Sequence, residues 1–106
     1  MPEPLKRFFG DAERAFLLTP AMIPELERKA GAGIGILCKK VFASAFSYAD
    51  ITETIRLGLI GGGASPEDAA SLTAIYVPAR PLAESYGLAV AILEHLMMGA
   101  REGEAA

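Results

Sequence analysis

Residues 50–63 read DITETIRLGLIGGG, and this stretch decides the fold. Asp50 begins a predicted helix, and Glu53 three residues later makes a variant of the capping box. Apolar residues then occupy almost every side of the helix, which is typical of a helix at the centre of a domain. Three consecutive glycines at 61–63 end the helix and act as a hinge. We therefore predict a central helix over residues 51–61, around which the rest of the chain packs.

The segments that follow and precede this helix also carry helical signals. Over residues 34–46 the apolar residues recur at helical spacing and form one stripe. Ser65 and Pro66, followed by two acids, open a helix that we place at residues 66–77. A last helix, over residues 81–98, carries more apolar positions than one packing partner requires.

The N-terminal part of the chain predicts a hairpin followed by one more helix. Two short runs rich in Phe and Leu lie on either side of Gly10 and Asp11, so we place a hairpin at residues 5–18. A Thr-Pro pair then opens a helix near residues 20–30, and Gly31 is a natural left-handed stop.

These elements predict a mainly α fold: a compact five-helix domain with a small N-terminal β-hairpin. No linker is long enough to divide the chain, so we expect one domain over residues 1–106. Its helical core is predicted at residues 19–99, and residues 100–106 are expected to form a flexible tail.

Composition disfavours several functional classes. The 106 residues are 52% hydrophobic and 22% charged, which is typical of a globular domain. The net charge of −3 disfavours a general nucleic-acid-binding protein, which needs an excess of cations. A single cysteine and a single histidine are too few for a Cys or His metal cluster. We therefore expect no metal, no cofactor, no nucleic-acid partner and no enzymatic activity.

Targeting signals are also missing from the sequence. Charged residues interrupt the N-terminal stretch where a signal peptide needs an apolar run. The longest uncharged run, residues 69–79, is shorter than the about 20 residues of a transmembrane helix. We expect no membrane association and a cytoplasmic location.

Two features invite a catalytic or ligand-binding interpretation. Residues 31–35 read GAGIG, but this spacing differs from a dinucleotide-binding fingerprint and favours a turn between helices. Cys38 lies on an apolar helix face, which is typical of a buried structural cysteine. His95 lies near a helix C-terminus, where a cation is favourable. A Cys38–His95 dyad is the catalytic alternative, although no third orienting group is evident.

Four stretches of the chain resemble a family of small proteins encoded among the tail genes of gene transfer agents and related tailed phages. The stretches are FFGDAER at 8–14, LTPAMIPELERKAGAGIG at 18–35, DITETIRLGLIGGG at 50–63 and YVPARPL at 76–82. The resemblance extends from about residue 5 to residue 99. Members are described as tail tube-like proteins or as tail assembly chaperones, and their motifs are structural, not catalytic.

The resemblance implies a non-enzymatic tail assembly chaperone, which coats the tape-measure protein until tube subunits replace it. Such a protein needs exposed apolar surface for its partner, the tape-measure or another tail protein, and for self-association. Leu88, Ile92 and Met98 stand off the main apolar line of the predicted last helix. We predict that these three residues bind the partner.

A structural component of the tail or tail tube is the alternative within the same family. The small hairpin favours the chaperone, because a tube subunit is expected to contribute a large β-sheet to a ring. An enzyme or nucleotide-binding protein and a helical DNA-binding regulator are further alternatives, but the sequence is poor in the residues that either needs. The presence of the chain in purified particles would favour the tail or tail-tube component, and its absence would favour the chaperone.

Overall fold

The computed structural model describes residues 3–99 of the chain, and the predicted flexible tail at 100–106 lies outside them. The described residues form a hairpin and five α-helices, the mainly α architecture that the sequence predicts. The elements are β1 (Leu5–Phe9), β2 (Ala12–Phe16), the short 3-10 helix η1 (Pro20–Met22), α1 (Ile23–Ala30), α2 (Ile34–Phe42), α3 (Tyr48–Gly61), α4 (Pro66–Ala79) and α5 (Leu82–Met98).

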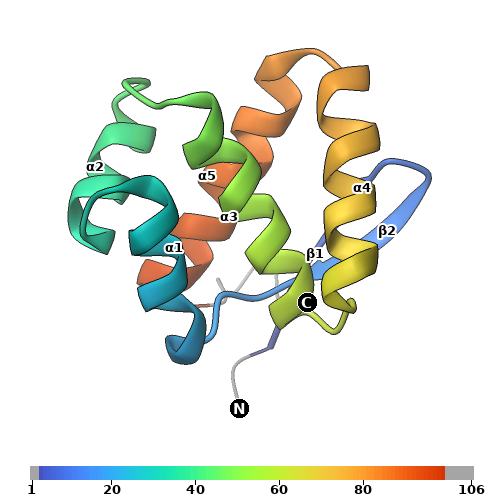
Figure 1. Cartoon of the computed structure of the whole chain (residues 1–106), viewed down its shortest axis with the longest axis horizontal. Coiled ribbons are helices and arrows are strands. Elements are labelled where there is room, and N and C mark those ends of the chain that lie inside the picture. Colours follow the sequence, from blue (N-terminus) through green and yellow to red (C-terminus); the bar gives the residue numbers. More distant parts are fainter. Residues whose placement is uncertain (1–2, 100–106) are drawn as a thin grey trace.

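Helix α3 occupies the centre of the molecule, as its all-round apolar sequence predicts. It packs against α1, α2, α4, α5 and β2, and Figure 1 shows it running between α1 and α2 on one side and α4 on the other. Half of its residues are buried, and they lie on more than one side of the helix: Asp50, Ile51, Thr54, Ile55, Leu57, Gly58 and Leu59. Burial of each Ile or Leu side chain stabilises the folded state by roughly 1.5–3 kcal/mol.

The start of α3 differs from the sequence prediction, which placed Asp50 in the cap position. Ser47 is the N-cap, and its Oγ accepts a hydrogen bond of 3.1 Å from the Asp50 N–H. The Asp50 carboxylate in turn accepts a 2.8 Å bond from the Ser47 N–H, which completes the capping box. Asp50 is fully buried, and Lys40 Nζ lies 3.3 Å from its Oδ2. The helix therefore begins one turn earlier than the sequence suggested.

Helix α2 ends at Phe42, four residues before the predicted boundary at 46. Ser44 has a φ of 61°, and this left-handed residue turns the chain away from the helix axis. The turn is closed by a 2.7 Å hydrogen bond from the Ala45 N–H to the Lys40 carbonyl. Phe46 is thereby freed from the helix and stacks on Tyr86 of α5, with ring centroids 4.8 Å apart.

The remaining helix boundaries are close to the predictions. The helix expected near residues 20–30 begins as η1 and continues as α1, and Gly31 ends it in the left-handed conformation with a φ of 72°. Helix α4 passes the expected end at 77 and includes Pro78 in its last turn. Helix α5 begins one residue later than predicted and ends at Met98.

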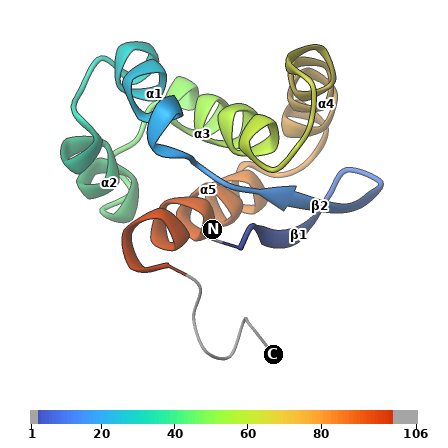
Figure 2. The same ribbon diagram turned by 90° about the horizontal axis from the view of Figure 1, so that it is seen from below.

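The hairpin has a two-residue turn at Gly10 and Asp11, and its antiparallel register pairs Phe9 with Ala12 and Leu5 with Phe16. Leu5, Phe9 and Phe16 are buried, and the rings of Phe9 and Phe16 meet edge to face at 6.1 Å. Figure 2 shows the hairpin between α5 and the layer that contains α3 and α4, with β2 on the α3 side.

Strand β2 leads into a segment that lies unusually close to the C-terminal part of α3. The Leu17 N–H donates a 2.9 Å hydrogen bond to the Gly58 carbonyl. A Cβ added at Gly61 would overlap the Leu17 carbonyl oxygen, and one added at Gly62 would overlap the carbonyl of Ala15. The glycines that the sequence marks as a helix end therefore also form the surface on which the strand docks.

We expect Gly61→Ala to destabilise the protein by roughly 1–3 kcal/mol, because the strand backbone must shift to admit the methyl group. Gly87→Ala is the matched control. It lies in α5 with nothing within 4 Å of the added Cβ, so it should stabilise by about 0.5–1 kcal/mol. Chemical denaturation of both variants measures the difference, and equal stabilities would contradict the close docking.

Candidate protein-contact site

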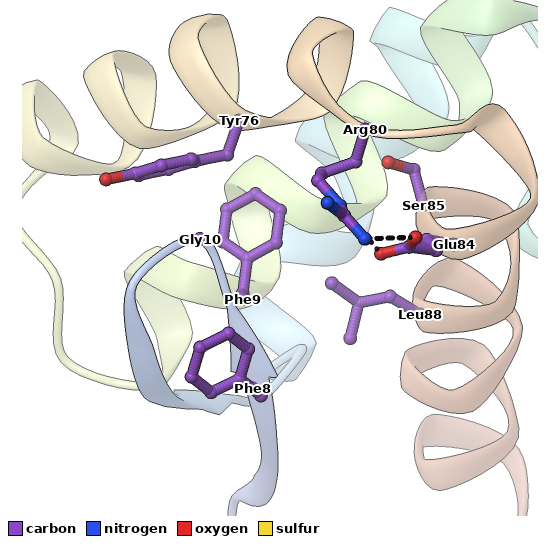
Figure 3. Close-up of a pocket in the computed structure, with 8 residues that line it drawn as sticks. All are labelled: Phe8, Phe9, Gly10, Tyr76, Arg80, Glu84, Ser85 and Leu88. Carbon is purple, nitrogen blue, oxygen red and sulfur yellow. Dashed lines mark hydrogen bonds and ion pairs between the residues drawn. The ribbon is translucent and has the colours of Figure 1, made fainter.

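A pocket of about 290 Å³ lies beside the hairpin, where β1 faces the end of α4 and the start of α5 (Figure 3). Its walls come from three elements that are far apart in the sequence. The lining residues are Phe8, Phe9, Gly10, Tyr76, Arg80, Glu84, Ser85 and Leu88. We call this pocket, together with the outer edge of β1, the hairpin-edge site.

The turn of the hairpin is fixed against the Tyr76 ring. Gly10 has a φ of 73°, a conformation that favours glycine, and an added Cβ would lie 2.5 Å from the ring carbon Cδ2 of Tyr76. Phe9 also meets Tyr76 edge to face, with centroids 6.0 Å apart. These contacts form the apolar wall of the pocket on the α4 side.

The opposite wall is polar. Arg80 Nε and Nη2 donate hydrogen bonds of 3.1 and 2.8 Å to the two carboxylate oxygens of Glu84. The hydrogen bonds from Arg80 hold the pKa of the Glu84 carboxyl below its usual value, and the same pair raises the pKa of Arg80. This exposed pair presents no net charge, so it marks the rim of the pocket without selecting an ionic ligand.

The outer edge of β1 is the main-chain part of the site. Phe9 and Ala12 flank a two-residue turn, where paired residues exchange their hydrogen bonds across the hairpin. Hydrogen-bonded and non-hydrogen-bonded pairs alternate, so the N–H and C=O of Phe8 point away from β2. The same alternation applies to Lys6, whose carbonyl accepts a 3.0 Å bond from Arg7 Nη1.

The three residues predicted to bind a partner do not form one surface. Leu88 is partly buried and lines the pocket, whereas Ile92 is only 2% exposed and belongs to the core. Met98 is 74% exposed at the end of α5 and takes no part in the pocket. Of the expected exposed row, Met98 is exposed and Ile92 is not, and partner binding by these residues stays a prediction. Leu88 and Ile92 share a helix face that packs inward, and six further residues place Met98 on a different side.

Sequence reasoning missed Phe8, Gly10 and Tyr76 as members of a site. The adjacent Phe8 and Phe9 could have indicated the site. Neighbouring residues in a strand point to opposite faces, so one of the two rings had to lie on the outer face of the hairpin. Phe9 fills the core face, and the Phe8 ring is 71% exposed. No local signal placed Tyr76 over the turn, because that contact joins residues 66 positions apart in the chain.

The structure places both sequence features for which a catalytic alternative was considered. The turn at residues 31–35 is a connection between α1 and α2, and a side chain already occupies the start of α2. The Ile34 N–H donates a 2.8 Å hydrogen bond to Glu27 Oε2. Cys38 and His95 are both buried, and no hydrogen bond joins them among residues 3–99.

A family model described as phage tail tube protein, GTA-gp10, matches residues 5–99 of the chain. The chain belongs to this family, as the four resembling stretches predict. The family is described as a phage tail tube family, so the protein has a tail-related role. Searches of curated proteins and of solved structures each found no significant match. Within the described residues, no helix is long and apolar enough to cross a membrane.

We expect Ile92→Ser to destabilise the protein by about 2–5 kcal/mol, because it removes a buried aliphatic side chain and buries a hydroxyl. Met98→Ser should change the free energy of unfolding by less than about 0.5 kcal/mol, since that side chain is exposed. Thermal melts of the two variants distinguish core from surface. An Ile92→Ser variant as stable as the unchanged protein would show that Ile92 lies at the surface and not in the core.

Burial raises the pKa of the Cys38 thiol. A raised pKa in the folded state means that the fold favours the neutral thiol, so this contribution to stability is lost as the pH rises above the ordinary thiol value. We expect the native thiol to react with an aromatic disulfide reagent far more slowly than the thiol in guanidinium-unfolded protein. Equal rates in the two states would show that Cys38 is accessible.

Proposed function

We propose that this protein is a structural component of the tail tube of a phage-like particle, which acts through contacts with other tail proteins or with copies of itself. The match of residues 5–99 to the tail tube family carries this proposal, because it spans the whole described fold except two residues. The proposal favours the tube component over the tape-measure chaperone that the sequence analysis preferred.

The surface of the protein supports a role in assembly. Large apolar side chains are exposed on four of the five α-helices and on the hairpin: Phe8, Ile36, Phe42, Tyr48, Ile75, Leu82, Met97 and Met98. Exposed apolar side chains lose water when a partner covers them, and this provides the driving force of most protein association. A tail subunit that is surrounded by neighbours requires such contacts on several sides.

The described sheet has only two strands, so it does not form the wall of a ring by itself. In a tail tube, the protein would have to extend this sheet with strands from neighbours or make its contacts through helices. The same scarcity of strands favoured the chaperone in the sequence analysis. The chaperone remains the second candidate, and its distinguishing property is that it leaves the finished particle.

The composition of purified particles tests the proposal. We expect quantitative mass spectrometry of intact, nuclease-treated particles to detect this chain at a fixed ratio to the major tail protein. Immunogold labelling with an antibody to the chain should mark the tail and not the head. The matched control is a cell extract from which particles have been removed.

Two results would overturn the tube assignment. The first is a chain that is abundant in the particle-free extract and absent from the particles, which would favour the chaperone. The second is a deletion of the gene that leaves tails of normal length and composition. A strain that carries the chain with a silent epitope tag provides the positive control for detection.

A further inference from the structure

We propose that the open edge of β1 is a strand-addition site, which binds an extended acidic segment of another protein of the same tail. The inference rests on the proposed function for the source of this partner. The site itself is defined by the geometry of the hairpin and its pocket.

The two edges of the hairpin are not equivalent. On the outer side of β2, the Leu17 N–H bonds to the Gly58 carbonyl and Gly62 lies against the Ala15 carbonyl, so the end of α3 covers the C-terminal part of that edge. On the outer side of β1, the main-chain groups of Phe8 bond to no other described residue. An added strand would bond to the N–H and C=O of Phe8 and to the N–H of Lys6, whereas the Lys6 carbonyl already accepts a bond from Arg7 Nη1.

The pocket beside this edge supplies selectivity for side chains. Alternate side chains of an added strand point to the same face, so one of them would enter the pocket between Phe9, Tyr76 and Leu88 (Figure 3). These three residues offer apolar surface, and the Phe8 ring extends it outside the pocket. An aliphatic side chain fits this surface better than a polar one, because nothing on the apolar wall pairs with a buried polar group.

The charge of β1 selects the partner. The strand contains two cations, Lys6 and Arg7, and no acid, and both cations are exposed. A second copy that paired through the same edge would bring another strand without an acid, so Lys6 would meet no opposite charge. A strand with carboxylates at alternate positions, on the face of Lys6 and Phe8, would instead place an opposite charge beside Lys6. The edge therefore favours an acidic segment over a second copy of the chain.

An NMR titration of the full-length protein tests this site with a defined probe. The probe is the capped hexapeptide EVELEV, in which acids alternate with aliphatic residues, and the charge-reversed hexapeptide KVKLKV is its control. We expect EVELEV to shift the amide signals of Phe8 and Lys6 and to slow hydrogen exchange at Phe8. We expect KVKLKV to bind at least about tenfold more weakly, and added salt to weaken EVELEV.

Three substitutions on the edge separate main-chain from charge effects. Phe8→Pro removes an N–H that points away from β2, so the hairpin keeps its ladder while the probe loses a bond, and affinity should fall at least about tenfold. Phe8→Ala keeps that N–H and should weaken binding less. Lys6→Glu should weaken EVELEV by about fivefold and strengthen KVKLKV. The Lys6→Glu variant tests the strand-addition site if the Phe8→Pro variant does not fold.

Three outcomes would overturn the inference. They are EVELEV shifts centred away from β1, unchanged affinity in folded Phe8→Pro, and shifts of the Phe8 amide on concentration of the protein alone, which would indicate a second copy. These measurements are independent of particle composition. A chain absent from particles would overturn the tube assignment and leave a responsive edge standing, whereas a present chain with an unresponsive edge would overturn only this inference.

Discussion

The backbone at the end of β2 lies directly against the backbone of the last turns of α3. The contact requires that Gly61 and Gly62 have no side chain on the facing side, and a hydrogen bond of 2.9 Å from the Leu17 N–H to the Gly58 carbonyl fixes its register. The position of Phe16 in the core follows from this docking, and so does the position of the hairpin turn under Tyr76. An isolated hairpin is marginally stable in water, so α3 is the scaffold on which this one depends.

The same contact creates the asymmetry of the molecule. It covers the C-terminal part of the outer edge of β2 with a helix, and it leaves the outer edge of β1 facing a pocket beside the end of α4 and the start of α5. Exposed edges promote unwanted pairing, and proteins commonly protect them with lysine or other charged residues. Lys6 fits this role, since an identical strand brings no acid to pair with it. A charge that prevents self-pairing also favours a partner of opposite charge, so protection and recognition need not conflict on this edge.

The sequence predicted all five helices, the hairpin and the central place of α3, because these depend on local periodicity, capping residues and glycines. It did not predict which residue begins α3 or where α2 ends. Those boundaries depend on Asp50, which is buried beside Lys40, and on Phe46, which leaves the helix to stack on Tyr86. It also did not show which apolar positions of α5 are exposed. The sequence of a helix that is apolar all round does not indicate which side its neighbours cover. Ile92 was therefore predicted to lie at the surface, although it packs in the core.

A mainly helical chain and membership of a tail tube family are compatible if the sheet is completed between molecules. Strand β1 has an open edge of five residues, which a strand from a neighbour is long enough to extend. The strand supplies directional hydrogen bonds, and the pocket and cations supply selectivity for the neighbour's side chains. The helices then have a separate task, because they hold the hairpin in place and carry the exposed apolar residues. Strand addition at β1 and helix contacts elsewhere would place each copy between several neighbours, which is the arrangement that a tube requires.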